Sequence, residues 1–338
     1  MPDGAPKVLD VQNLNTVFQT RSGEVHAVNR VSFSLKAGEL LGVVGESGSG
    51  KSVTMMSLIG LIPSPPAEVR AGRVLFDGMD LLKVDADTLR DIRGARIGFV
   101  FQDPMTSLNP VFTVGFQLRE PLRRHMGLNK RDANRRAVEL MELVGIPDAE
   151  ARLKDYPHQF SGGMRQRVMI AIALACDPEV LIADEPTTAL DVTIQAQILE
   201  LVKELRQKLG MAIIWITHDL GVIAGISDRV MVMYGGQVVE EAPVRELFKN
   251  PAHPYTKALL ETIPHVRGQR AERLEVIEGQ PPILGDAPTA CPFRDRCAVA
   301  IDICARENPA RRPVGDGHDA ACHLVGADAP RRAEAADV

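Results

Sequence analysis

The chain has 338 residues, of which 45% are hydrophobic and 25% charged, so it holds enough apolar material for one or two folded domains. Its 39 Lys and Arg against 44 Asp and Glu give a formal net charge of −5, which argues against a dedicated nucleic-acid binder. The longest apolar run, residues 168–176, is far shorter than the roughly 20 residues of a membrane span, and the polar start lacks a signal peptide's apolar stretch. We therefore expect a cytoplasmic chain that does not itself cross a membrane.

Apolar, β-rich segments alternate with helical patterns up to about residue 240, which is typical of an α/β domain with a largely parallel sheet. Buried strands are predicted at residues 40–44, 180–183 and 212–216. A helix that stops at Gly210 is predicted from one apolar face, formed by Ile194, Ile198, Leu201, Val202, Leu205 and Leu209. Periodicity weakens after residue 250, so we expect a smaller domain at about 250–325 and a flexible tail at 326–338.

Residues 45–52, GESGSGKS, match the phosphate-binding pattern G-x-x-x-x-G-K-[ST] between a predicted strand and a helical run. The glycines allow consecutive N–H groups to point at phosphate oxygens, Lys51 reaches the β- and γ-phosphates, and the Ser52 hydroxyl ligates Mg²⁺. The alternative is a Gly/Ser-rich loop that only turns the chain. We expect the nucleotide phosphates to be bound by Gly45, Glu46, Ser47, Gly48, Ser49, Gly50, Lys51, Ser52 and Val53.

Two carboxylates, Asp184 and Glu185, end the apolar segment VLIA. The carboxyl ends of parallel strands form the ligand-binding edge of open α/β sheets, so both are expected at the nucleotide. Asp184 would hold Mg²⁺ and Glu185 would polarise the attacking water. A solvated strand end is the alternative.

Residues 161–166, SGGMRQ, begin a long helical pattern between these two motifs. With GESGSGKS upstream and Asp184-Glu185 downstream, residues 8–240 resemble the ATP-binding cassette of ABC transporters, whose signature motif is SGGxxQ. The resemblance implies an ABC-type P-loop ATPase domain at 1–249, with an antiparallel β subdomain and a helical subdomain at about 103–165. It also implies that two cassettes pair head to tail around ATP.

Further roles follow from the resemblance, position by position. Phe18 corresponds to the aromatic residue that stacks on adenine, although a core Phe is an alternative. Gln102, after the strand IGFVF, corresponds to the glutamine that touches Mg²⁺ or water and senses the transmembrane subunits, and His218 to the histidine that contacts the γ-phosphate. The implied catalytic set is Lys51, Gln102, Glu185 and His218. The resemblance also implies a set of residues that lie at the dimer interface or at the partner's nucleotide. These are Ser161, Gly162, Gly163, Gln166 and Asp191.

Three segments, at residues 102–110, 250–260 and 277–282, resemble the ATPase subunits of oligopeptide/dipeptide importers. The implied function is ATP hydrolysis that energises peptide import from the cytoplasmic face of the membrane. The implied partners are a second ATPase subunit, two transmembrane permease subunits and an extracellular peptide-binding protein, with no nucleic acid. Alternatives are an importer for nickel, glutathione or another small solute, a soluble ABC ATPase acting on ribosomes or DNA, and a redox or metal sensor.

Four cysteines, Cys291, Cys297, Cys304 and Cys322, lie within the last 50 residues, separated by five, six and seventeen positions. Four thiolates hold either zinc or an iron–sulfur cluster, and the spacing favours neither. His318 and His323 flank Cys322 and are possible zinc ligands. Because some members of the importer subfamily carry a [4Fe-4S] cluster on C-terminal cysteines, the resemblance implies such a cluster here. Zinc and reduced thiols without metal are the alternatives.

Overall fold

Five adjacent parallel strands form one side of the larger of two β-sheets. The computed structural model describes residues 6–188, 190–262 and 277–326, and within them this sheet has the order β11-β12-β10-β9-β3-β8-β7-β6. The parallel strands are β6 (Ile97–Val100), β7 (Val180–Asp184), β8 (Ala212–Ile216), β3 (Leu40–Val44) and β9 (Arg229–Tyr234). The strands predicted at 40–44 and 212–216 are confirmed, and the one predicted at 180–183 extends to Asp184.

Both faces of this sheet are covered, which explains why its central strands are apolar at almost every position. Successive side chains of a strand point to opposite faces. Leu41 and Val43 accordingly join one buried cluster, whereas Leu40 and Val44 join the other. The first cluster includes α1 (Lys51–Leu58), and the second includes α8 (Val192–Leu209) and α9 (Leu220–Ile226).

The helix predicted from the apolar face of residues 194–209 is α8. It buries Ile198, Leu201, Val202 and Leu205, and it ends as expected at Gly210, whose φ of 68° is left-handed. In the described ranges, no helix combines the length and the hydropathy that crossing a bilayer requires.

A four-stranded antiparallel sheet packs on the first cluster. Its order is β2-β1-β4-β5, and its strands are β1 (Lys7–Thr20), β2 (Gly23–Lys36), β4 (Ala67–Phe76) and β5 (Met79–Asp80). Helix α1 contacts β1 and β2, so this sheet covers the helix that follows the glycine-rich loop. The helix α2 (Ala86–Ile92) follows it before the chain returns to the larger sheet at β6.

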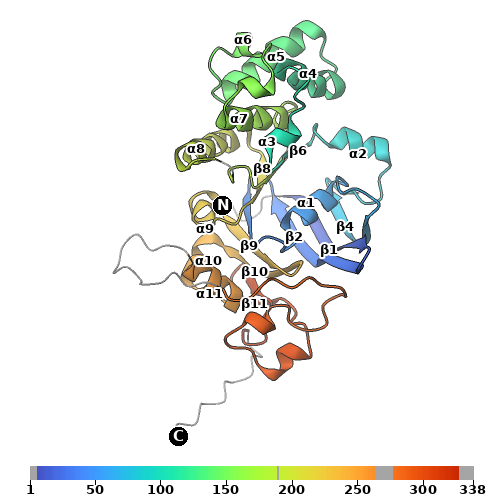
Figure 1. Cartoon of the computed structure of the whole chain (residues 1–338), viewed down its shortest axis with the longest axis vertical. Helices are drawn as coiled ribbons and strands as arrows, with labels where there is room; N and C mark the ends of the chain where they lie inside the picture. The colour runs from blue at the N-terminus through green and yellow to red at the C-terminus, as the bar shows by residue number, and fades with distance from the viewer. Residues whose placement is uncertain (1–5, 189, 263–276, 327–338) are drawn as a thin grey trace.

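A group of helices between β6 and β7 forms one end of the molecule (Figure 1). They are α3 (Pro104–Ser107), α4 (Val114–His125), α5 (Lys130–Leu143), α6 (Ala149–Arg152) and α7 (Gly162–Ala173), with a 3₁₀ turn at Pro157–Gln159. Thr113, Asn129 and Ser161 cap α4, α5 and α7 by accepting backbone N–H groups at their first turns. Cys176 lies three residues beyond the end of α7 and is half-buried.

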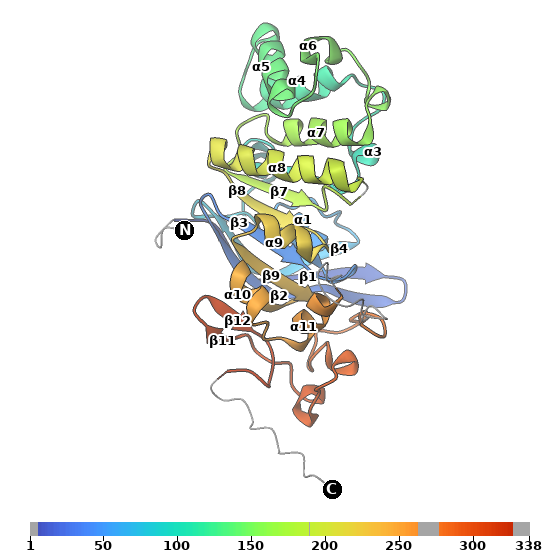
Figure 2. The ribbon, with the colours of Figure 1, turned by 90° about the vertical axis from the view of Figure 1, so that its left-hand side faces the viewer.

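The C-terminal region lies at the opposite end and extends the larger sheet (Figures 1 and 2). Its strands β11 (Arg312–Gly315) and β12 (His318–Ala320) are antiparallel, and β12 pairs with β10 (Gln237–Pro243). Two helices, α10 (Val244–Lys249) and α11 (Pro254–Glu261), connect the cassette to this region, which also has 3₁₀ turns at Arg294–Arg296 and Asp302–Ala305. A tail is predicted at 326–338, and its residues 327–338 lie outside the described residues.

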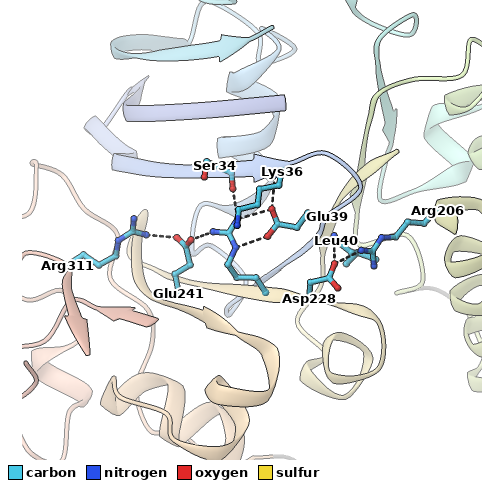
Figure 3. Close-up of polar contacts among 9 residues, drawn as sticks. Ser34, Lys36, Glu39, Leu40, Arg206, Asp228, Glu241 and Arg311 are labelled. Atoms are coloured by element: carbon cyan, nitrogen blue, oxygen red, sulfur yellow. Dashed lines mark hydrogen bonds and ion pairs between the residues drawn. The ribbon is translucent and has the colours of Figure 1, made fainter. Parts of the chain in front are cut away.

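A row of charged side chains joins the two sheets to the C-terminal region (Figure 3). Arg229 of β9 contacts both Glu39 and Glu241, and its guanidinium also donates to the Ser34 carbonyl of β2. Arg311 donates to the other oxygen of Glu241 at 2.6 Å. Glu39 and Glu241 are largely buried, so their charges require these guanidinium partners.

Candidate active site

The glycine-rich loop lies between β3 and α1 and curls around the side chain of Lys51. The Lys51 ammonium donates to the Gly45 carbonyl at 2.7 Å and to the Glu46 carbonyl at 2.9 Å. A side chain at Gly50 is excluded, since φ is 95° there and a Cβ atom would lie 2.5 Å from the Ala27 carbonyl oxygen. The predicted residues 45–53 thus form a loop, residues 45–50, and the first turn of α1. Ser47 and Gly48 are exposed, whereas Ser49 and Lys51 are buried.

Burial lowers the pKa of the Lys51 ammonium, while the charges of Glu185, Asp184 and Glu46 act in the opposite direction. The negative charges of these three carboxylates therefore offset part of the cost of burying the Lys51 ammonium.

Asp184, the last residue of β7, meets Ser52 at the start of α1. The Ser52 hydroxyl donates to Asp184 Oδ1 at 2.8 Å. Burial raises the pKa of the Asp184 carboxyl and the Glu185 charge adds to this, whereas the Ser52 hydrogen bond and the Lys51 charge oppose it. A hydroxyl and a carboxylate side by side are the oxygen donors that suit Mg²⁺, so the residues present fit the predicted metal.

Two of the predicted catalytic side chains, those of Gln102 and His218, meet at Glu185. Its Oε2 accepts from Gln102 Nε2 at 3.1 Å and lies 3.4 Å from His218 Nδ1. Gln102 follows β6 and His218 follows β8, and both strands are parallel neighbours of β7, so their carboxyl ends meet at one edge. Glu185 has a φ of 44°, a left-handed conformation that is rare outside glycine and that occurs at functional turns.

Thr188 also contacts Glu185, and the sequence reasoning missed it. Its hydroxyl donates to Glu185 Oε2 at 2.9 Å. The signal in the sequence was that Thr188 lies only three residues after Glu185. The Thr188 N–H donates to the Glu185 carbonyl at 3.3 Å, and this tight turn brings the Thr188 hydroxyl back to the Glu185 carboxylate. Thr188 therefore restrains the same oxygen that faces Gln102 and His218.

The predicted signature residues begin α7. Ser161 is its N-cap and accepts from the Met164 N–H at 3.3 Å, and both Ser161 and Gly162 are exposed. Gly163 is buried, and a Cβ atom there would lie 2.6 Å from Ile194 Cγ2 of α8. Gln166 is buried as well, and among the described residues its side-chain nitrogen has no hydrogen-bond partner.

Two other predicted residues lie apart from the Glu185 cluster. Asp191 is exposed and caps α8 by accepting from the Ile194 N–H at 3.0 Å. Phe18 is half-buried near the end of β1, opposite Val25 of β2 and Ala67 of β4. The roles given to both stay predictions.

Cys291, Cys297, Cys304 and Cys322 line one small cavity of about 10 Å³, together with His253, Phe293 and His323. Burial raises the pKa of the Cys291 thiol to about 11 and also raises the pKa of Cys297 and Cys322. Among the described residues, no group of three or more His, Cys, Asp or Glu side chains is arranged to hold a metal ion.

The two histidines near Cys322 differ in their surroundings. His323 lines the cysteine cavity and contacts the Glu307 carbonyl at 3.0 Å. His318 instead contacts the buried Glu240 carboxylate at 2.8 Å. As a zinc ligand, His318 would have to give up that partner.

Two residues of the C-terminal region reach the glycine-rich loop, which sequence reasoning did not foresee. The Tyr255 hydroxyl accepts from the Glu46 N–H at 2.9 Å, and the Arg296 guanidinium contacts the Glu46 carboxylate. The side chain of Arg296 is only 6% exposed, although it lies among the four cysteines in a segment without regular periodicity.

Comparison with known proteins agrees with this geometry. Residues 28–188 match the family model described as ABC transporter, and residues 239–304 match the oligopeptide/dipeptide transporter, C-terminal region. The dipeptide transport ATP-binding protein DppD of Bacillus subtilis is 52% identical over 318 residues, covering 94% of this chain and 95% of the relative. The chain belongs to the oligopeptide/dipeptide type of ABC transporter ATPases.

Other relatives of this ABC ATPase are similarly close. The oligopeptide transport ATP-binding protein OppD of B. subtilis is 50% identical, covering 96% of this chain and 91% of its own length. Among solved structures, the cassette MJ0796, a dimer bound to ADP and Pi, has a TM-score of 0.63 and 30% identity. It covers 70% of this chain and 99% of its own length, so the shared fold is the cassette. The ABC ATPase fold predicted from the sequence is confirmed.

Proposed function

We propose that the chain hydrolyses ATP to energise the import of peptides through a membrane ABC transporter. The observation that carries this proposal is the convergence of Gln102 and His218 on Glu185, beside the Ser52–Asp184 pair. The peptide substrate is supported by the relatives, which are named as dipeptide and oligopeptide transport proteins.

The chemistry assigned to these residues is phosphoryl transfer from ATP to water. Lys51 and the loop N–H groups hold the β- and γ-phosphates, and Phe18 stacks on adenine. Glu185 orients the attacking water and takes its proton, while His218 contacts the γ-phosphate. Ser52, Asp184 and Gln102 would hold Mg²⁺, which neutralises charge that develops on the phosphate oxygens.

The partner of one chain is a second ATPase subunit, which completes each nucleotide site. Exposure of Ser161 and Gly162 at the start of α7, and of Asp191 at the start of α8, supports this role because these residues are free to meet another surface. Helix α7 presents its N-terminal N–H groups there, which favour an anion such as the partner's ATP. Gly163 and Gln166 would act from within α7, by setting how that end is presented.

The permease subunits are proposed to dock on an apolar surface beside Gln102, at the cytoplasmic face of the membrane. Phe101, Phe112 and Phe116 are between 41% and 48% exposed, and Phe112 stacks on Phe116 at 4.6 Å between ring centroids. A neighbouring groove of about 450 Å³ is lined by Phe99, Phe101 and Phe116 and by residues of α4 and α7. Large exposed apolar groups next to one another mark protein contact sites.

We also propose that Cys291, Cys297, Cys304 and Cys322 hold a [4Fe-4S] cluster. Support comes from the four thiols lining one cavity and from the resemblance to the importer subfamily. Anaerobically purified protein should contain about four irons per chain and absorb broadly near 400 nm, and Cys304→Ser should lose most of both. Stoichiometric zinc, or colourless metal-free protein, would refute the cluster.

The peptide-import proposal is tested in proteoliposomes that contain the chain with its permease, its other ATPase subunit and its binding protein. We expect ATP-dependent accumulation of a labelled di- or oligopeptide, which Glu185→Gln abolishes. Accumulation of nickel or glutathione in place of peptide would favour the alternative solutes. ATP hydrolysis stimulated by ribosomes or DNA would favour the other class of ABC ATPase.

A further inference from the structure

Residues that follow the cassette hold Glu46, the second residue of the phosphate loop, by contacts on two sides. On the main-chain side, the Glu46 N–H donates to the hydroxyl of Tyr255, a fully buried side chain of α11. On the side-chain side, Arg296 donates to Glu46 Oε2 at 2.6 Å and to Oε1 at 2.9 Å. Two groups from beyond residue 250 thus hold the second residue of the loop.

Arg296 is itself fixed by its surroundings. Its Nε donates to the Glu278 carbonyl at 2.8 Å, and its Nη2 donates to the Ile277 carbonyl at 3.0 Å. Its Nη1 also donates to the Tyr234 hydroxyl at 3.2 Å, at the end of β9. A guanidinium with this many partners loses little further freedom when it holds a carboxylate in the two-pronged geometry, so the contact is both strong and specific.

The contacts of Tyr255 and Arg296 bear on ATP binding because of the position of Glu46 in the phosphate loop. The Glu46 carbonyl accepts from Lys51, so the peptide groups on both sides of Glu46 are fixed, one by Tyr255 and the other by the phosphate-binding lysine. The Glu46 carboxylate also carries a negative charge on the loop that is to receive the polyphosphate. Without Arg296, that charge would repel ATP and compete for Lys51.

We infer that Arg296 and Tyr255 are positioning residues for ATP binding, which hold Glu46 and neutralise its charge, so that the C-terminal region forms part of the nucleotide site of its own chain. The inference rests on the ATP site proposed above. Phe293 connects these contacts to the cysteine cavity. Its ring centroid lies 5.3 Å from that of Tyr255, and Phe293 also lines the cavity. Helix α11, which carries Tyr255, lies beside the C-terminal region in Figures 1 and 2.

The test compares Arg296→Gln with Arg294→Gln, a control only two residues away. Arg294 is 40% exposed and pairs with its sequence neighbour Asp295, which is 81% exposed. For the full-length chain, equilibrium binding of a fluorescent ATP analogue should weaken about tenfold in Arg296→Gln and stay unchanged in Arg294→Gln. In the assembled transporter, KM for ATP should rise by a similar factor while kcat changes less than about twofold.

A second substitution tests whether ATP binding weakens in Arg296→Gln because the Glu46 charge is no longer neutralised or because the fold is damaged. Adding Glu46→Gln to Arg296→Gln removes the uncompensated charge and should restore most of the lost affinity. Tyr255→Phe, which removes one hydroxyl and keeps the buried ring, should weaken ATP binding about threefold. This variant tests the inference if Arg296→Gln does not fold. Wild-type affinity in both Arg296→Gln and Tyr255→Phe, or no rescue by Glu46→Gln in a folded double variant, would overturn the inference. Absence of ATP binding by the wild-type chain would instead refute the proposed function.

Discussion

Glu185 Oε2 accepts from Gln102 and Thr188 and lies near His218, so one carboxylate oxygen is directed by three side chains. We predict that Glu185→Gln retains ATP binding but lowers turnover at least ~10²-fold, because the amide cannot accept a proton from water. Turnover is measured in the assembled transporter, with Glu200→Gln as a control at an exposed carboxylate of α8. Wild-type turnover in Glu185→Gln would exclude Glu185 as the base.

Substitution of Lys51, unlike that of Glu185, should mainly weaken the binding of ATP. Its ammonium already holds the loop carbonyls of Gly45 and Glu46, so Lys51→Ala removes both a loop contact and the charge that meets the phosphates. We expect ATP affinity to fall at least tenfold, measured by equilibrium binding, with Lys203→Ala as the surface control. Normal affinity together with normal turnover would contradict the phosphate-loop assignment.

At the scale of elements, Gly163 sets how closely α7 approaches the start of α8. A Cβ atom at Gly163 would lie 2.6 Å from Ile194, whereas one at the preceding residue, Gly162, would come no closer than 3.7 Å to Leu190. Gly163→Ala should therefore lower the free energy of unfolding by about 1–3 kcal/mol, while Gly162→Ala should leave it unchanged or slightly higher. Denaturant unfolding of both variants checks this, and equal effects would refute the packing argument.

The elements were largely predictable from the sequence because their cause is local. Strands β3, β7 and β8 are short and almost entirely apolar in sequence, and α8 carries both an apolar face and a glycine that ends it. The Glu185 cluster was partly predictable for a similar reason, since parallel strands place Gln102, Asp184 and His218 at one edge.

The contacts with Glu46 could not be predicted in this way. Arg296 lies 250 positions from Glu46, in a segment without periodicity, and nothing local distinguishes it from the exposed Arg294. Its partner is set by how the C-terminal region folds back along β9 and β10. The burial of Gln166 within α7 could not be predicted from its motif either, and the role given to Gln166 stays a prediction.

On the scale of the whole molecule, Arg229 joins the larger sheet to the antiparallel sheet through Ser34, and it joins the C-terminal region through Glu241, which Arg311 also contacts (Figure 3). Arg229→Met should destabilise the fold by about 3–5 kcal/mol at pH 7.5, since it removes the cation that pairs with the largely buried Glu39 and leaves Glu241 paired with Arg311 alone. An exposed ion pair is worth far less, so Arg90→Met, whose partner Asp87 is 82% exposed, is the control and should change stability by less than about 0.5 kcal/mol.

Denaturant unfolding of both variants at pH 7.5 measures the difference in stability. A loss of stability in Arg229→Met no larger than that in Arg90→Met would contradict the role given to Arg229.

The pairing of β12 with β10 has a consequence for where this protein can be cut. A chain that stopped at residue 249, the boundary suggested by the sequence, would leave β10 as an unprotected sheet edge, with Glu240 and Glu241 deprived of His318 and Arg311. In the intact chain the edge is instead the short strand β11, where Pro313 has no N–H to offer a neighbouring chain. The C-terminal strands thus also guard against self-association, so fragments ending before them should form soluble aggregates under conditions in which the full-length chain does not.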